Sequence, residues 1–97
     1  MFYAKSYDNG KDIVVAICDK GILGKTVEGN KFQITISESF YGNEEIGKEK
    51  SIEMIKGCTI ANLMGDEIVG LAIDQGFITK ENVISINGVR HAQFVKI

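Results

Sequence analysis

The fold of this chain is decided by its last strand-like stretch, Val83-Ile84-Ser85-Ile86-Asn87-Gly88-Val89-Arg90-His91-Ala92-Gln93-Phe94-Val95. Two β-rich runs, 83–86 and 89–95, meet there at the pair Asn87-Gly88. An Asn-Gly pair between apolar runs is the strongest short-range signal for a β-hairpin, because a type I′ turn needs positive φ at both central residues. The stretch therefore predicts a closing hairpin with a two-residue loop, which fixes the register of both strands.

This register places the histidine and the arginine of the hairpin on opposite faces. With a two-residue loop, Ile84 lies opposite His91 and Ser85 lies opposite Arg90, and directly paired residues share a face. The predicted His91 face consists of Ile84, Ile86, Val89, His91, Gln93 and Val95. Because this is the more apolar face, we expect the imidazole to point inward and the guanidinium outward. A buried imidazole needs hydrogen-bond partners, since an unmatched polar group costs about 1–3 kcal/mol.

The rest of the chain reads as three strands followed by two helices. Strands are expected over residues 2–7, 12–19 and 31–36, the last with Phe32, Ile34 and Ile36 on its buried side, and residues 21–29 are expected to form a loop. The first helix starts near Lys48 and weakens at Gly57, after which residues 60–64 continue an apolar turn. Asp66 suits the N-cap of the second helix, and Gly76 suits its C-terminal end.

The order β-β-β-α-α-β-β predicts one α+β domain over residues 1–97. We expect a small, mostly antiparallel sheet of about five strands with two helices on one face. The hydrophobic content of 44% and the charged content of 25% are typical of a globular domain.

Composition also limits the partners and the cellular location. A formal charge of −2 argues against a general electrostatic grip on phosphate backbones. No apolar run is long enough to span a bilayer and no secretory signal opens the chain, so we expect no membrane contact and a cytoplasmic location. In that compartment Cys18 and Cys58 are expected to remain reduced thiols.

Several catalytic patterns can be weighed and set aside. Gly21-Ile22-Leu23-Gly24-Lys25-Thr26 ends like a phosphate-binding loop, but Asp19 stands where the first glycine is needed, which favours a surface turn with a solvated Lys25. A Cys58–His91 dyad lacks any local nucleophile context. One histidine and two distant cysteines lack the spacing of metal ligands, so no metal or cofactor is predicted.

The candidate binding residues are those able to surround His91. Asn62 is a poor residue for a helix interior and could line a shallow site with His91 and Gln93. Tyr41 and Lys25 complete the set, as a side chain that could stack and a cation that could meet phosphate. For His91 the alternative remains a satisfied core histidine.

With these residues in view, the chain resembles the archaeal domain-of-unknown-function family 424. The resemblance covers nearly the whole length. It rests on Met1-Phe2-Tyr3-Ala4-Lys5, Leu23-Gly24-Lys25-Thr26, Ser37-Glu38-Ser39-Phe40-Tyr41-Gly42, Ile60-Ala61-Asn62-Leu63-Met64-Gly65 and Gly88-Val89-Arg90-His91-Ala92-Gln93. It implies an archaeal cytosol and supplies no reaction.

Because no complete catalytic set is present, the leading hypothesis is a non-catalytic module that binds a protein or a structured RNA. The alternatives are a small enzyme or ligand-binding domain that uses His91 with Cys58 or Tyr41, and a homodimer formed by pairing of exposed strand edges.

Overall fold

A computed structural model describes residues 1–29, 31 and 33–96 of the chain. Its strands are β1 (Phe2–Asp8), β2 (Ile13–Asp19), β3 (Thr26–Glu28), β4 (Gln33–Thr35), β5 (Glu44–Ile46), β6 (Ile60–Met64), β7 (Val83–Ile86) and β8 (Val89–Val95). Its helices are η1 (Lys20–Ile22), α1 (Glu38–Tyr41), α2 (Lys48–Gly57), α3 (Asp66–Asp74) and η2 (Lys80–Asn82). The predicted α+β class is confirmed.

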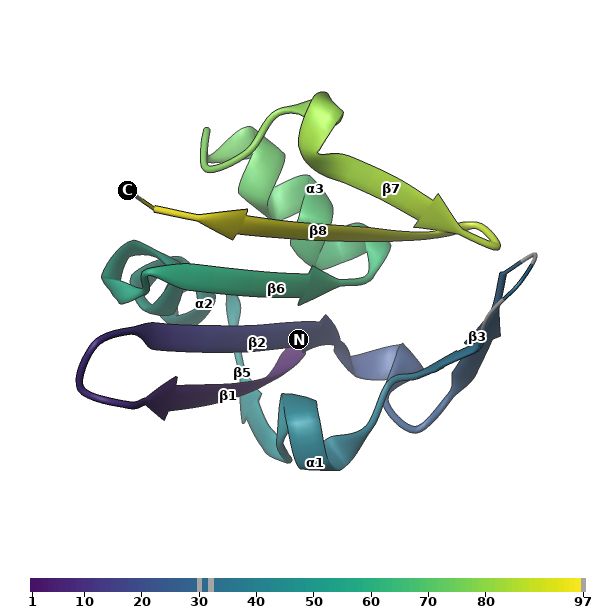
Figure 1. Ribbon diagram of the computed structural model, residues 1–97, viewed down its shortest axis with the longest axis horizontal. Helices are drawn as coiled ribbons and strands as arrows, with labels where there is room; N and C mark the ends of the chain where they lie inside the picture. The colour runs from purple at the N-terminus through teal and green to yellow at the C-terminus, as the bar shows by residue number, and fades with distance from the viewer. Residues whose placement is uncertain (30, 32, 97) are drawn as a thin grey trace.

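Six strands form the main sheet, in the order β5-β1-β2-β6-β8-β7 (Figure 1). All neighbours are antiparallel except β2 and β6, which run parallel. β3 and β4 form a separate two-stranded sheet. The expected count of about five strands was therefore low, because β3 lies in the predicted loop, β6 lies in the predicted helical turn, and no strand was predicted where β5 forms.

The closing hairpin has the predicted register. Ile84 pairs with His91 and Ile86 pairs with Val89, so the loop contains two residues. Asn87 has a φ of 48° and Gly88 a φ of 85°, as a type I′ turn requires. The Asn87-Gly88 pair alone was therefore sufficient to predict the register of this hairpin.

The segment 60–64 is a strand, so its assignment to an apolar helical turn was wrong. α2 ends at Gly57 as expected, and the chain then enters β6 in the centre of the sheet, between β2 and β8. A strand covered on both faces shows no clean alternation of polar and apolar residues. A run of five such residues therefore cannot be separated from a buried helical turn by periodicity.

The sheet has two differently covered faces. α2 and α3 pack on the first face, behind the sheet in Figure 1, as the expectation of two helices on one face required. The buried core on this side includes Val15, Ile17, Ile55, Ala61, Leu63, Ile68, Val69 and Ala92. α1 and the β3–β4 hairpin cover part of the second face, where Ala16, Cys18, Val27, Ile36, Tyr41, Met64 and Ile86 form a smaller core.

α1 is tied to the second face through β1. The Tyr7 hydroxyl donates to the Phe40 carbonyl at 2.6 Å, and Lys5 Nζ donates to the Ser39 carbonyl at 3.2 Å. These bonds hold the last turn of α1 against the sheet. The strand expected over 31–36 is shorter than predicted, with Ile34 half-buried and Ile36 buried, whereas Phe32 lies outside the described residues.

The start of α3 is capped by a residue distant in sequence. Gly65 is the N-cap and Asp66 is the first helical residue, so the assignment of the N-cap to Asp66 was wrong by one position. The Asp19 carboxylate, at the end of β2, accepts from the backbone N–H groups of Glu67 and Ile68, both at 2.9 Å. The side chain that argued against a phosphate loop is therefore a helix cap.

Candidate functional site

Three predicted site residues meet on the second face of the sheet. Tyr41 is the last residue of α1, Asn62 is the middle residue of β6, and His91 lies in β8, the strand paired with β6. The Tyr41 hydroxyl donates to Asn62 Oδ1 at 3.0 Å, and His91 Nε2 lies 3.1 Å from the same oxygen. We call these three residues the polar trio.

The geometry of the polar trio defines the protonation of His91. An amide oxygen only accepts hydrogen bonds, so His91 Nε2 carries the proton that reaches Asn62 Oδ1. In the neutral ring, Nδ1 is then an acceptor. No hydrogen bond to Nδ1 is found in the described part of the chain.

Burial keeps the polar trio uncharged. Tyr41 is only 5% exposed, and its burial raises the pKa of the phenol above its usual range. His91 is half-buried, and burial lowers the pKa of its imidazole. At neutral pH the side chains of Tyr41, Asn62 and His91 are therefore all uncharged.

The cysteines do not supply a nucleophile to this site. Cys58 is buried in the core between the sheet and the helices, whereas His91 lies on the opposite face, so the two side chains do not form the dyad that was considered as an alternative. Cys18 shares the smaller core with Tyr41, and burial raises the pKa of its thiol to about 11. Both cysteines are free, as expected for reduced thiols.

The other two candidate residues do not join the polar trio. Gln93 is exposed and lies opposite Asn62 in the β6–β8 register. Lys25 is exposed where the chain enters β3, and its backbone carbonyl accepts from the N–H of Ile36. Within residues 1–29, 31 and 33–96, no hydrogen bond links either side chain to Tyr41, Asn62 or His91.

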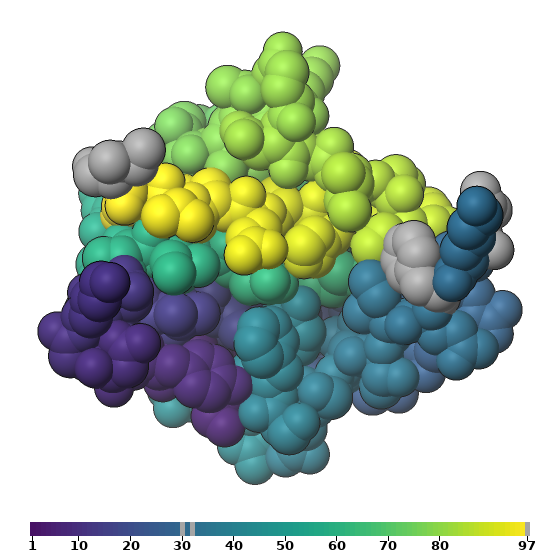
Figure 2. Space-filling view, in the orientation of Figure 1, coloured from purple at the N-terminus to yellow at the C-terminus, as the bar shows by residue number. Residues whose placement is uncertain are grey.

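The surface beside the polar trio is apolar and open. Ile84 is 56% exposed and Val95 is 60% exposed, although both belong to the hairpin face that was expected to point inward. In Figure 2, β8 (yellow) crosses the middle of this side of the molecule. We define the open stripe as Ile84, His91, Gln93 and Val95, which share one face of β7 and β8. The sequence predicted that these four residues share one face, but it did not predict that this face is exposed.

Arg90 also departs from its expected orientation. It lies on the face opposite His91, as predicted, but this face carries α3. Its Nη2 donates to the Asp66 carbonyl at 2.7 Å, so the guanidinium packs on the first turn of α3 and does not project outward.

The polar trio lies outside the two hollows described for this structure. One hollow, of about 1010 Å³, lies at the edge of β1, and the other, of about 510 Å³, lies near η1 and Glu67. Neither contains Tyr41, Asn62 or His91. Among the described residues, no cluster of three His, Cys, Asp or Glu side chains could hold a metal ion. None of the described helices combines the length and the apolar character needed to cross a membrane.

The fold and the site define a small α+β domain with a neutral polar cluster on an open sheet face. The model of the family described as protein of unknown function (DUF424) matches residues 7–97, and the chain belongs to this family. The crystal structure of an uncharacterized conserved protein from Methanopyrus kandleri has a similar fold. Its TM-score is 0.83 at 19% identity, over 99% of this chain and 93% of that chain. No curated protein matches the chain.

The lowered pKa of His91 predicts a loss of stability on mild acidification. In the unfolded chain His91 titrates near 6.5, above its pKa in the folded protein. Between these two values the unfolded chain binds more protons, so the free energy of unfolding decreases as the pH falls. Urea unfolding at pH 7 and at about pH 5.5 measures this decrease, which should be smaller in His91→Gln. Equal pH slopes in the two proteins would contradict the assignment.

Proposed function

We propose that this protein is a non-catalytic module that binds a protein partner in the cytoplasm through the open stripe. The observation that carries the proposal is the position of the polar trio on an open sheet face, beside exposed aliphatic side chains and outside both hollows. Small-molecule sites are usually concave and enclose their ligand. A face with apolar side chains around a few fixed polar groups is typical of a protein interface.

The chemistry of the open stripe favours a protein over RNA. Ile84 and Val95 offer apolar contacts, and His91 Nδ1 offers an acceptor to a hydrogen-bond donor of the partner. Phosphate groups need cations, whereas the chain carries a formal charge of −2 and the open stripe contains no lysine or arginine. The partner is therefore expected to present apolar side chains and a hydrogen-bond donor.

Catalysis is less well supported by the same contacts. Tyr41 and His91 are joined only through the Asn62 oxygen, so neither acts on the other directly. A general acid or base also needs a reacting atom within reach in a site that holds the substrate. The pairing of His91 with Tyr41 in an enzyme stays a prediction, and neither of the two hollows described above contains these residues.

The test places a charge in the open stripe. Immobilised wild-type protein is used to isolate a partner from extract of the source cells, and the purified partner is then titrated calorimetrically. Val95→Glu is expected to weaken this binding at least tenfold, which corresponds to about 1.4 kcal/mol. Gln75→Glu is the matched control, because it adds the same charge at an exposed position beyond the end of α3.

Other results would contradict the proposal. Binding that survives Val95→Glu would place the interface elsewhere. If the captured material is released by ribonuclease and its binding weakens steeply as the salt concentration rises, the partner is RNA. Circular dichroism of both variants checks that the loss of binding does not reflect unfolding.

A further inference from the structure

The outer edge of β1 is only half covered. β5 pairs with β1 from Phe2 to Ala4 and then ends, whereas β1 continues to Asp8. In the described part of the chain, no strand pairs with Ser6, Tyr7 or Asp8 on this side. The sheet therefore has an open edge next to a short strand that is already part of it.

The hydrogen-bond alternation shows which backbone groups are free at this edge. Lys20 N–H donates to the Met1 carbonyl, and Asn9 N–H donates to the Asp12 carbonyl. In an antiparallel pair the bonded positions recur every second residue, so the odd-numbered residues of β1 bond to β2. The N–H and C=O groups of Ser6 and Asp8 therefore point outward, in line with those of Ala4 that meet β5.

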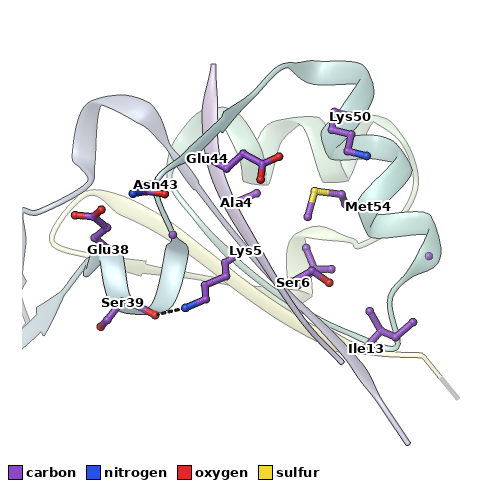
Figure 3. A pocket seen from close by; sticks show the side chains of 13 residues that line it. Ala4, Lys5, Ser6, Ile13, Glu38, Ser39, Asn43, Glu44, Lys50 and Met54 are labelled. Atoms are coloured by element: carbon purple, nitrogen blue, oxygen red, sulfur yellow. Dashed lines mark hydrogen bonds between the residues drawn. The ribbon is translucent and has the colours of Figure 1, made fainter. Parts of the chain in front are cut away.

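A groove of about 1010 Å³ lies against this edge. Ser6 of β1 and Ile13 of β2 line it, and Met54 lines it from α2 (Figure 3). Gly57, the last residue of α2, is also part of the lining. Glu38 and Ser39 of α1 line the side away from α2, and Glu44 lies beside Ala4. An added strand would place the side chain opposite Ser6 on the α2 side of the sheet. The small serine leaves room there, and Ile13 and Met54 provide apolar contacts.

We propose that the β1 edge binds an extended segment of another protein as an added antiparallel strand, with an apolar side chain opposite Ser6. The free backbone groups of Ser6 and Asp8 supply the pairing, and the groove selects the side chain. This site is separate from the open stripe and independent of the proposed function, because β1 and β7–β8 lie at opposite sides of the sheet.

A second copy of this chain fits the edge less well. Two β1 edges related by a two-fold axis keep residues of the same face together, so Ser6 would pair with Ser6 or with Asp8 of the other copy. Neither side chain is apolar, and the groove would receive a small hydroxyl or a carboxylate. The geometry thus favours a different chain over the predicted edge-paired homodimer.

The probe is a displayed library of random heptapeptides, selected on the wild-type protein. Enriched peptides are expected to alternate polar and apolar residues around a central aliphatic side chain. Their affinity should fall at least tenfold with Ser6→Pro, which removes an outward N–H that bonds to no strand and is therefore compatible with the fold. Ser6→Tyr, which fills the groove and keeps the N–H, should also block binding. Ser85→Pro on the edge strand β7 is the matched control and should leave binding unchanged.

Amide hydrogen exchange gives a second measurement that does not depend on variants. In the free protein, the Ser6 amide should exchange faster than those of Lys5 and Tyr7, and it should become protected when an enriched peptide binds. The proposal is overturned if the Ser6 amide is already protected, if enriched peptides bind the Ser6 variants equally well, or if selection yields no alternating peptides. Self-association through β1, detected by light scattering and abolished by Ser6→Pro, would instead identify a second copy as the occupant.

Discussion

Replacing Gly65 with alanine is expected to lower the free energy of unfolding by about 2–4 kcal/mol, from backbone strain and loss of a helix cap together. Gly65 has a φ of +123°, a conformation that residues with a Cβ rarely adopt. An added Cβ would also collide with the carboxylate of Asp19. The alanine variant must therefore strain its backbone and displace the carboxylate that caps α3.

Urea unfolding of Gly65→Ala measures this loss. Gly21→Ala is the control, because its φ is ordinary and an added Cβ there meets no atom within 4 Å. A double-mutant cycle with Asp19→Ala separates the two causes, since removal of the carboxylate removes the collision and leaves the strained φ. If Gly65→Ala costs as much without the Asp19 carboxylate as with it, the collision contributes nothing.

This cap also shows what the sequence alone could not predict. The helix over residues 66–74 was expected from its apolar stripe and from Gly76, and the structure contains it. Its cap, however, comes from β2, and no local pattern links Asp19 to a helix that begins 47 residues later. The same limit explains β6, whose five residues gain their identity as a strand from the parallel pairing with β2.

The candidate site could likewise be predicted only where local sequence patterns determine it. The Asn-Gly turn fixed the register of His91, and the scarcity of asparagine in helix interiors singled out Asn62. The structure places both residues and Tyr41 together, although Asn62 is in a strand and not near the end of a helix. Gln93 is the register partner of Asn62, but it is exposed and no hydrogen bond to the polar trio is found among the described residues. Lys25 lies next to β3, away from β6 and β8.

Replacing Asn62 with alanine is expected to cost about 2–3 kcal/mol in the free energy of unfolding, because one oxygen serves two donors. The Tyr41 hydroxyl is buried and would lose its acceptor, and the half-buried His91 N–H would lose the same atom. Urea unfolding at pH 7 measures the loss. Gln93→Ala removes an exposed neighbour on the same face and should change stability by less than about 0.5 kcal/mol.

Asn62→Asp keeps the shape and the accepting oxygen but adds a negative charge beside His91. This charge should raise the pKa of His91 above its value in the wild-type protein, because it favours the imidazolium. If the pKa in the folded variant exceeds 6.5, the value of the unfolded chain, acidification from pH 7 to about pH 5.5 stabilises the variant while it destabilises the wild type. His91 is the single histidine of the chain, so its titration can be followed by NMR without assignment of others. A His91 pKa that is the same in both proteins would show that the imidazole does not contact residue 62. That result would contradict the hydrogen bond between His91 Nε2 and Asn62 Oδ1.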